Sequence, residues 1–294
     1  MKKHDLSIII LNYNGRFWLK NTLESLREYY LEKTKYSVEV IVVDNASNDD
    51  STTMLKRSFR WAKLIELKEN LGFAAGNNIA IKNNNSKYIM LLNSDTQLNS
   101  ESNFDQLIDV LEERKDIAVI TPKISLANGQ IDMACHRGEP TLWNSLTYFS
   151  GLESLFPKIK IFSEYHQLYK DLSTIHEIDA CSGAAMLVRN ESIKKVGLLD
   201  ERFFMYAEDL DWCKRFKDAD YKIVYYPLVN IIHHKYKSGI KSNTKVEQNK
   251  TSFHFYDTML EFYNKHYAKN HPRFLRALVK IFIKIKKRPR RKLT

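Results

Sequence analysis

An α/β fold with a largely parallel sheet is predicted for this chain by two observations. Apolar runs of strand length alternate with segments of helical periodicity, and polar segments containing Asp, Glu and Asn stand at the ends of three apolar runs, at residues 42–45, 91–95 and 206–209. Open α/β sheets bind ligands in the crevice beyond the carboxyl ends of their strands. Acidic side chains that reach this crevice from distant parts of the chain indicate a polar pocket suited to a nucleotide, a divalent metal and a reaction that needs a base.

The first half of the chain has the alternation of a nucleotide-binding half. A buried strand is expected at 7–11, followed by a turn and a crossover helix in which Leu19, Leu23 and Leu26 share one face. Further strands are expected at 38–43, 63–67, 88–92 and 117–121, and further helices at 53–59, 74–84 and 104–113. This alternation implies parallel pairing, so roughly the first 120 residues read as a Rossmann-like half.

The second half of the chain is less regular. Residues 123–178 are rich in aromatic residues and Leu and show no clear period. Beyond them we expect a strand at 184–189, helices at 191–196 and 210–219, a strand at 221–226 closed by Pro227, and another strand at 229–232. Pro122 is expected to close the strand at 117–121 in the same way.

The net charge of +11 is unevenly distributed along the 294 residues. Residues 265–294 contain twelve Lys or Arg and no Asp or Glu, which leaves a net charge of −1 for the first 264 residues. The basicity therefore belongs to the tail and not to the body. Because 44% of the residues are apolar and 12% are aromatic, the chain can bury a substantial core, and disorder is not expected.

Cysteine usage and the N-terminus bear on the compartment. Cys135, Cys181 and Cys213 lie far apart and lack a CxxC spacing, which favours a reducing compartment over a disulfide framework or a zinc site. The apolar stretch at 6–11 is too short for the core of a signal peptide. The sequence contains no uninterrupted run of about 18 apolar residues, so it predicts no membrane-spanning helix.

Several short motifs occur together and in a fixed order. They are SIIILNYN (7–14), VDNAS (43–47), NLGFAAGNN (70–78), GAAM (183–186), DERFFMYAED (200–209) and the histidine pair at 233–234. In combination they resemble family-2 glycosyltransferases with the GT-A fold, especially the bacterial rhamnosyltransferase-like subgroup. The resemblance spans residues 7–267 and implies a Rossmann-like nucleotide-binding half fused to an acceptor-binding half.

The resemblance implies a nucleotide-sugar site. Asp44 would accept a hydrogen bond from the imide N–H of uracil or thymine, and Tyr13 would lie against the base. The remaining residues of the expected donor site are Asn12, Asn45, Ser47, Asn70, Gly72, Gly76, Asn77, Asn78, Asn93 and Ser94. Two alternatives stay open: Asp44 as a turn former or helix cap, and the segment at 70–78, which is neither GxGxxG nor a P-loop, as a tight turn with close helix packing.

The resemblance also implies a metal site for Mg²⁺ or Mn²⁺. Asp95 stands where the family's DxD motif ends, and Asn93 replaces the first acid of that motif. One carboxylate can suffice when diphosphate oxygens and water complete the shell. Adjacent histidines point opposite ways in extended chain, and His233 is the expected partner of the metal or diphosphate. Lys235 and Lys237 could neutralise diphosphate or be ordinary surface lysines.

Asp209 matches the catalytic base of the family. An inverting displacement needs one carboxylate to take the proton of the acceptor hydroxyl. Glu208 would orient this base or contact the acceptor. The structural alternative is that both acids only stabilise the N-terminus of the helix that follows, as Asp211 is expected to do within its first turn.

The tail has the pattern of a basic amphipathic helix. Phe274, Leu278, Ile281 and Ile285 share one face, and the basic residues Arg276, Lys280, Lys284 and Lys287 share another; further basic residues fill 286–292. This pattern favours binding to an anionic membrane surface. Nucleic acid and a plain packing helix are the alternatives. We therefore expect a GT-A domain at 1–267 and an amphipathic extension at 268–294, with no nucleic-acid partner.

Together these expectations describe an inverting, metal-dependent glycosyltransferase. It would move a sugar from dTDP-rhamnose or a UDP-hexose to a saccharide or lipid-linked saccharide in bacterial surface polysaccharide synthesis, at the cytoplasmic face of the inner membrane. The alternatives are a catalytically inactive sugar-nucleotide-binding or scaffold protein and a sugar nucleotidyltransferase. The latter would need a Gly-rich segment with Lys or Arg after the first strand, which this chain lacks.

Overall fold

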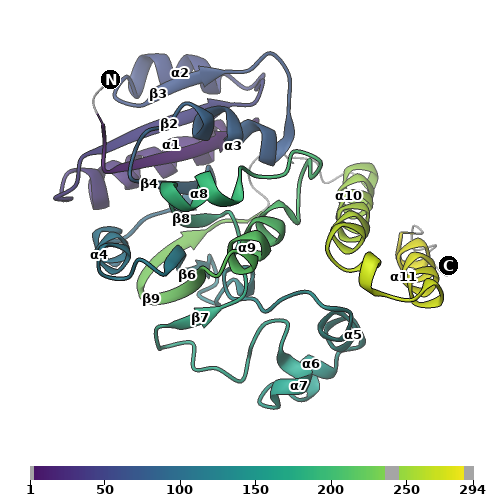
Figure 1. The fold of residues 1–294 in the computed structure, drawn as a ribbon. Coiled ribbons are helices and arrows are strands. Elements are labelled where there is room, and N and C mark those ends of the chain that lie inside the picture. Colours follow the sequence, from purple (N-terminus) through teal and green to yellow (C-terminus); the bar gives the residue numbers. More distant parts are fainter. Residues whose placement is uncertain (1–2, 236–244, 288–294) are drawn as a thin grey trace.

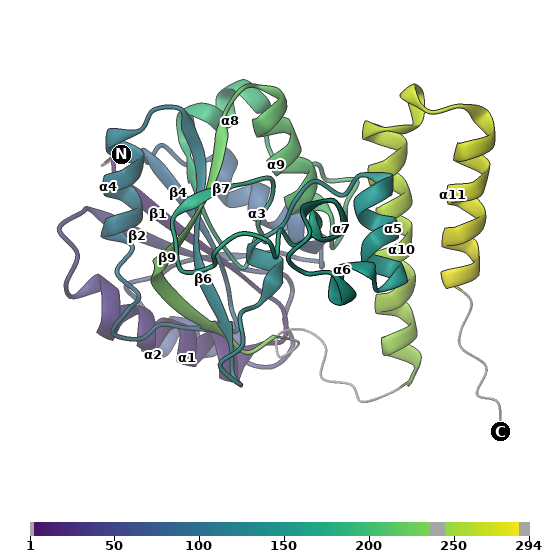
Figure 2. The same cartoon turned by 90° about the horizontal axis from the view of Figure 1, so that it is seen from below.

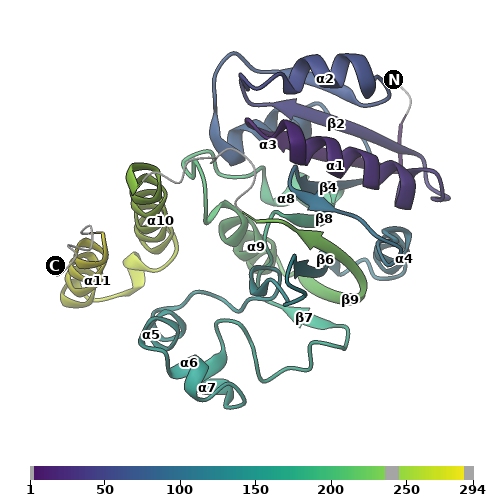
Figure 3. The same cartoon turned by 180° about the vertical axis from the view of Figure 1, so that it is seen from behind.

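A nine-stranded mixed sheet forms the centre of the computed structural model, which describes residues 3–235 and 245–287 (Figure 1). The strand order is β3-β2-β1-β4-β8-β6-β9-β5, and β7 pairs with β9. Helix α1 lies on one face of the sheet, and α8 and α9 lie on the other (Figures 1 and 3). The α/β fold predicted from the sequence is confirmed.

The elements have the following bounds. The strands are β1 Leu6–Asn12, β2 Val38–Asp44, β3 Lys63–Glu66, β4 Tyr88–Asn93, β5 Thr96–Gln97, β6 Ile117–Leu126, β7 His176–Ile178, β8 Ala185–Arg189 and β9 Lys222–His233. The α-helices are α1 Arg16–Leu26, α2 Ser51–Ser58, α3 Gly72–Lys82, α4 Asp105–Glu113, α5 Leu142–Ser150, α6 Leu152–Leu155, α7 Lys160–Ser163, α8 Asn190–Val196, α9 Glu208–Asp218, α10 Lys245–His266 and α11 Arg273–Lys286. A π-helical turn (Arg27–Leu31) extends α1, and 3₁₀ turns cover Met133–Cys135 and Ala268–Asn270.

Strands β3, β2, β1 and β4 are parallel and form the Rossmann-like half. The apolar residues of β1, β2 and β4 are largely buried, as expected of strands covered on both faces, whereas the edge strand β3 is only partly buried. The register places Asn12 opposite Asp44, and Leu11 opposite Asn93. The carboxyl ends of β1, β2 and β4 therefore coincide, and the polar residues that follow them meet at one edge of the sheet.

The prolines of β6 and β9 do not end their strands, contrary to the expectation from the sequence. Strand β6 continues through Pro122, and β9 runs as one strand through Pro227. The parallel register of the two strands shifts at this point, from Pro122 opposite Tyr226 to Lys123 opposite Asn230. The shift places Pro227 in a bulge, where a residue without an N–H breaks no ladder hydrogen bond.

The aperiodic middle of the sequence is an excursion with little regular structure. It contains the end of β6, a 3₁₀ turn, the short helices α5, α6 and α7, and β7, which pairs antiparallel with β9. Figures 1 and 2 show these three helices beside the sheet, with α5 near the C-terminal helices. Short helices give too few turns for a sequence period to be visible, which explains why none was found.

Helices α10 and α11 follow the sheet domain and pack on each other. The buried carboxylate of Asp211 in α9 joins α10 to the body, because its Oδ1 accepts a hydrogen bond from His266 Nε2 (2.7 Å) and pairs with Lys265. Asp211 lies in the first turn of α9, as predicted. Within the described residues, no helix has the length and hydrophobicity needed to cross a membrane. The boundary predicted between 267 and 268 stays a prediction.

Candidate active site

Asp44 is held at the carboxyl end of β2 and is 2% exposed. Its Oδ1 accepts a hydrogen bond from Asn12 Nδ2 (3.0 Å), and its Oδ2 accepts one from the backbone N–H of Ser47 (2.9 Å). Ser47 Oγ in turn accepts from Asn12 Nδ2 (3.2 Å) and from the backbone N–H of Asn14 (2.9 Å). A carboxylate can accept about four hydrogen bonds, so capacity remains for a base N–H. The Ser47 contact is that of a turn former, and the two roles are compatible.

Asn45 fastens the loop after β3 to the end of β2. Its Nδ2 donates to Asn70 Oδ1 (2.8 Å) and its Oδ1 accepts the backbone N–H of Leu71 (2.8 Å). Gly72 follows with φ +81°, and a Cβ there would lie 2.3 Å from the carbonyl oxygen of Phe204. Only glycine tolerates both conditions. The donor-side loop at 70–73 is therefore packed directly against the loop at 200–207 that leads to the expected base.

Three further residues of the expected donor site have structural contacts in α3. A Cβ on Gly76 would lie 2.6 Å from Leu11 Cδ1, so this glycine permits close approach of α3 to β1. Asn77 Nδ2 donates to the carbonyl four residues before it (2.9 Å). Asn78 Nδ2 donates to Leu199 O and to Glu201 Oε1, both at 2.9 Å. Their role in donor binding stays a prediction, and helix packing accounts for their present positions.

The expected metal site centres on Asp95, which is 2% exposed just beyond β4. His233 Nε2 lies 3.2 Å from Asp95 Oδ1 and 3.3 Å from Asn93 Nδ2, while Nδ1 lies 3.2 Å from Asp132 Oδ2. Burial opposes the charged imidazole, but the hydrogen bonds to Asp132 and Asp95 outweigh it and raise the pKa of His233 to about 9. Lys235 Nζ also pairs with Asp132 (2.9 Å).

The adjacent histidines point opposite ways, as predicted. His233 is buried, whereas the partly exposed His234 stacks on Trp18 with ring centroids 4.5 Å apart and hydrogen-bonds to Gln97 (2.9 Å). Lys237 lies outside the described residues. Ser94 is buried, and its Oγ has no hydrogen-bond partner among the described residues.

The donor set around Asp95 fits a hard or borderline divalent cation only in part. Within the described residues, no group of three or more His, Cys, Asp or Glu side chains is arranged to hold a metal. Asp95 supplies a carboxylate oxygen, which suits Mg²⁺ and Mn²⁺. His233 could join only after losing its proton, with Asp132 then orienting the ring through Nδ1. Most of the shell would have to come from the ligand's own oxygens and from water.

The two acids expected to serve the reaction begin α9. Tyr206 (φ 73°) and Ala207 (φ 65°) are consecutive non-glycine residues in the left-handed region, and this turn starts the helix. Glu208 is 6% exposed, and its Oε2 has no hydrogen-bond partner among the described residues. Burial, with the neighbouring charge of Asp209, raises the pKa of Glu208 to about 8. Glu208 is therefore poised to be neutral at pH 7.

Asp209 forms a buried ion pair with Arg137, a residue that the sequence analysis missed. The Nη2 atom of Arg137 lies 2.6 Å from Asp209 Oδ2, and the two side chains are 11% and 13% exposed. Burial opposes the guanidinium charge, yet Asp209 and other neighbours raise the pKa of Arg137. Arg137 is fixed by its backbone, which exchanges hydrogen bonds with Ala180 (3.0 and 2.9 Å). Asp132 was missed as well; both residues lie in the aperiodic segment, where no sequence signal marks them.

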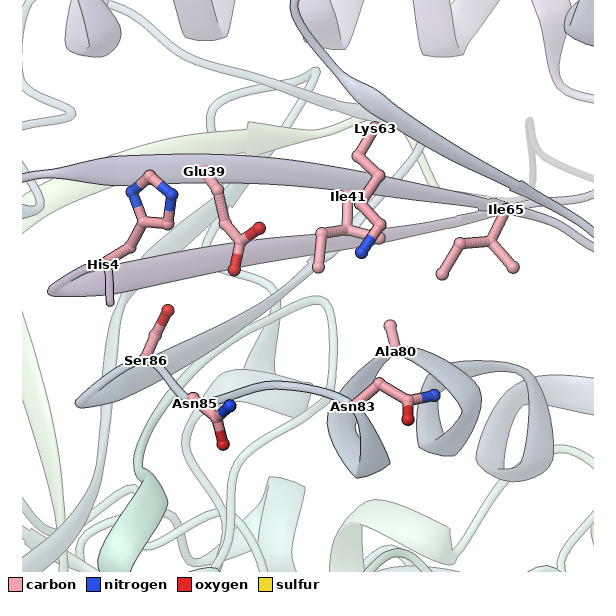
Figure 4. A pocket seen from close by; sticks show the side chains of 9 residues that line it. All are labelled: His4, Glu39, Ile41, Lys63, Ile65, Ala80, Asn83, Asn85 and Ser86. Atoms are coloured by element: carbon pink, nitrogen blue, oxygen red, sulfur yellow. The ribbon is translucent and has the colours of Figure 1, made fainter. Parts of the chain in front are cut away.

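A hollow in the described residues lies at the other end of the sheet. Its volume is about 220 Å³, and it opens between α3 and the amino ends of β1, β2 and β4. Figure 4 shows Glu39 of β2 and Ser86 before β4 facing each other across it, with Asn83 at the end of α3. Glu39 accepts a hydrogen bond from Ser7 Oγ (2.5 Å) there. None of the predicted site residues lines this hollow.

The chain belongs to glycosyl transferase family 2, because the sequence model of that family matches residues 7–196, more than half of the chain. The chain is thus a glycosyltransferase, as the resemblance implied. A low-salt glycan biosynthesis hexosyltransferase of Haloferax volcanii is 26% identical over 270 residues, which cover 90% of this chain and 76% of that protein.

Two further relatives are rhamnosyltransferases. The N-acetylglucosaminyl-diphospho-decaprenol L-rhamnosyltransferase of Mycobacterium tuberculosis is 25% identical over 241 residues, covering 78% of this chain and 76% of that protein. A rhamnosyltransferase of Escherichia coli is 27% identical over 240 residues, covering 77% and 82%. The chain is therefore rhamnosyltransferase-like within its family.

Solved structures show the GT-A fold. The mannosyltransferase PcManGT of Pyrobaculum calidifontis, in complex with GDP-Man and Mn²⁺, matches with a TM-score of 0.56 at 14% identity, covering 98% of this chain and 72% of that one. TarS of Staphylococcus aureus matches with a TM-score of 0.55 at 16% identity and 98% coverage, and this chain spans 44% of the TarS chain. At these identities the likeness concerns the fold alone, and it confirms the predicted fold class.

Proposed function

We propose that this family-2 glycosyltransferase is an inverting, metal-dependent enzyme that uses a thymidine or uridine diphosphate sugar. The single observation that carries this proposal is the buried Glu208–Asp209 pair, in which Arg137 binds Asp209 and which directly follows the loop that contacts Gly72. In this proposal the base lies near the nucleotide site, because the loop at 70–73 packs directly on the loop at 200–207. Two relatives named as rhamnosyltransferases favour dTDP-rhamnose as the donor, with a UDP-hexose as the second choice.

Asp209 would act as the general base. The acceptor hydroxyl oxygen forms a bond to the anomeric carbon while the bond from that carbon to the diphosphate oxygen breaks, and the proton of the hydroxyl passes to Asp209. Arg137 keeps the carboxylate of Asp209 in place through the 2.6 Å contact. Glu208, neutral near pH 7, can donate a hydrogen bond to the acceptor without adding a second negative charge.

Asp44, with Asn12 and Ser47 behind it, would receive the imide N–H of the pyrimidine, and Tyr13 would lie against the ring. Asp95 would hold Mg²⁺ or Mn²⁺, and His233 would face the same charge. A bound divalent cation would neutralise the diphosphate as it leaves. Asn93, Ser94 and the loop residues Asn70 and Gly72 would complete the walls of the donor site.

The acceptor would be a saccharide or a lipid-linked saccharide. One relative is named for an acceptor attached to diphospho-decaprenol, which favours a lipid-linked saccharide. The exposed apolar stripe of α11, together with the basic residues of the tail, would contact an anionic membrane surface. The enzyme would then act from the cytoplasmic face of that membrane.

Screening the purified protein by mass spectrometry against a panel of nucleotide sugars tests the donor proposal. With Mn²⁺ present, slow hydrolysis or transfer should occur from dTDP-rhamnose or a UDP-hexose and release the matching diphosphate. Nucleotide binding without any turnover would support the inactive scaffold instead. Release of inorganic pyrophosphate from a nucleoside triphosphate and a sugar phosphate would support a nucleotidyltransferase.

A further inference from the structure

Exposed apolar side chains gather in two segments of the molecule. Among the described residues, 18 large hydrophobic side chains are exposed. Twelve of them belong to residues 143–161 or to α11: Trp143, Leu146, Tyr148, Leu155, Phe156, Ile159, Ile161, Phe274, Leu278, Ile281, Phe282 and Ile285. Exposed apolar residues scattered singly need no explanation, but a concentration of this kind marks an interaction surface.

Helix α11 has two apolar faces, which the sequence alone did not separate. Ile283 is only 4% exposed, and Leu275 and Val279, at four-residue spacing before it, are partly buried on the same face. The opposite stripe consists of Phe274, Leu278, Ile281 and Ile285, which are 54–68% exposed. The outer stripe is therefore not needed for packing on α10, and it has no cover in the described fold.

Residues 154–161, with the sequence SLFPKIKI, form an exposed segment of apolar and basic residues. It runs from the end of α6 to the start of α7. All eight residues are exposed, and Leu155, Ile159 and Ile161 are 68%, 46% and 59% exposed. Two lysines, Lys158 and Lys160, lie between them, and the segment contains no Asp or Glu. The apolar side chains of this segment would gain free energy on leaving water, and its lysines attract anions.

Helix α5, which leads into residues 154–161, lies beside α11. The ring centroids of Phe149 in α5 and Phe282 in α11 are 5.7 Å apart, and Lys286 Nζ lies within 6 Å of both rings, at 5.9 and 5.6 Å. Figure 1 shows α5 near α11, with α6 and α7 beyond α5. The exposed segment at 154–161 and α11 are therefore linked through α5.

We propose that residues 154–161 and the outer stripe of α11 form one docking surface for the headgroup region of an anionic bilayer. Leu and Ile side chains would enter the acyl boundary, and the lysines beside them would lie at the phosphates. Neither segment carries an acidic side chain, and this uniform basic charge favours an anionic lipid over a protein partner. The proposal rests on the proposed function, in which the tail contacts the membrane. It adds a second membrane contact, made by residues 154–161 on the side of the catalytic base.

The second contact matters because its segment is joined to the base. Gly138, directly after Arg137, donates its backbone N–H to the carbonyl of Tyr165 (2.8 Å), and a Cβ on Gly138 would overlap the carbonyl of Glu164. The chain that leaves the exposed segment at 161 thus packs on Gly138, the neighbour of the residue that holds Asp209. Docking through residues 154–161 places the acceptor side of the enzyme at the lipid surface, where a lipid-linked saccharide would be found.

A fluorescent label at a single cysteine tests this contact in the full-length protein. All three native cysteines are buried, so Leu155→Cys provides one reactive thiol for an environment-sensitive dye. We expect a blue shift with phosphatidylglycerol-containing vesicles for Leu155→Cys and for Ile281→Cys. Leu228→Cys, 60% exposed in the bulge of β9, is the matched control and should show no shift.

Vesicle sedimentation supplies a second measurement that does not depend on a dye. Leu155→Ser/Ile159→Ser/Ile161→Ser should lower partitioning onto anionic vesicles at least about tenfold, because each buried apolar side chain contributes more than 1 kcal/mol. Leu228→Ser should partition as the unmodified protein does. Added salt should weaken partitioning of the unmodified protein, since exposed lysines are screened.

Three outcomes would overturn the inference. One is that the emission of the dye at position 155 does not shift with vesicles while the emission of the dye at position 281 does. Another is unchanged sedimentation of the triple serine variant. The third is a dye shift that follows protein concentration without lipid, which would assign the surface to a second copy of the chain. Turnover of a soluble acceptor analogue should be unchanged in the triple variant; if the unmodified protein binds vesicles but never transfers sugar, the proposed function fails and the docking surface stands.

Discussion

The carboxylate of the donor side, Asp44, and the two carboxylates of the base side differ in how their oxygens are satisfied. On the donor side, Asp44, Asn45 and Ser47 are joined to neighbouring loops by hydrogen bonds of 2.8–3.2 Å. On the base side, the carboxylates of Asp209 and Glu208 are buried at neighbouring positions. Asp209 is paired with Arg137, whereas the Oε2 atom of Glu208 has no hydrogen-bond partner among the described residues.

This difference separates two kinds of contribution. A crevice whose loops are already fixed can bind a nucleotide without much reorganisation. A buried carboxylate pair lowers the stability of a protein. Such pairs are retained mainly where a reaction needs groups of unusual proton affinity. We therefore expect substitutions on the donor side to change affinity and those on the base side to change turnover.

Asp209→Asn should have the largest effect. Transfer should fall by roughly 10²–10⁴, the range of a lost general base, while the dissociation constant of the donor stays within about threefold. Single-turnover assays and a donor titration on the same preparation measure both quantities. Near-normal transfer by this variant would remove Asp209 as the base.

Removal of divalent metal should come next. Chelation should lower transfer at least about 10²-fold, since a cation supplies several kcal/mol of charge stabilisation at the leaving diphosphate. Asp95→Ala should weaken diphosphate binding in Mn²⁺ and leave the weaker metal-free binding unchanged. The control is Asp50→Ala, an exposed acid before α2. Full activity in excess chelator would exclude the metal from the reaction.

Arg137→Met should lower transfer by roughly 10–10², because the base loses the contact that positions it. It should also destabilise the fold by about 3–5 kcal/mol, since it leaves a buried carboxylate unpaired. Arg137→Lys should recover part of the transfer rate, and Arg137→Met/Asp209→Asn should be more stable than Arg137→Met alone. Equal stability of these two Met variants would show that the unpaired carboxylate of Asp209 carries no stability cost.

Glu208→Gln should have the smallest effect and should be visible as a pH dependence of stability. The folded-state pKa of Glu208, raised to about 8, lies above its unfolded value, so its contribution is present at low pH and is lost as the pH rises through about 8. Thermal unfolding from pH 4.5 to 8.5 should show the unmodified protein losing roughly 1–4 kcal/mol relative to the variant. Parallel curves would place Glu208 in a polar, charge-stabilising environment instead.

Much of the donor side could be predicted from the sequence because its chemistry is local. Asp44 is the last residue of β2, and strands of one parallel sheet bring their carboxyl ends together whatever the helices between them are. The strand ends at Pro122 and Pro227 were predicted wrongly. Strand β6 continues past Pro122, and the register shift that follows places Pro227 in a bulge within β9.

The base side could be predicted only in part. Glu208 and Asp209 stand in a recognisable motif, but Arg137 reaches Asp209 across 72 residues from a segment without periodicity. A long-range ion pair leaves no trace in spacing. The exposed stripe of α11 was named from the sequence, whereas the second apolar face, which buries Ile283, was not.

The central claim is that the carboxyl ends of β1, β2 and β4 hold a pyrimidine nucleoside diphosphate, and nucleotide binding to the unmodified protein tests it most directly. Thermal-shift titration with UDP, dTDP, GDP and CDP in the presence of Mn²⁺ should show stabilisation by UDP and dTDP. Cytosine presents an acceptor where uracil and thymine present N–H and would face the Asp44 carboxylate unfavourably. Guanine has an N–H donor, but its larger ring would have to fit beside Tyr13. Greater stabilisation by GDP or CDP would contradict the role of Asp44 and the placement of the nucleotide.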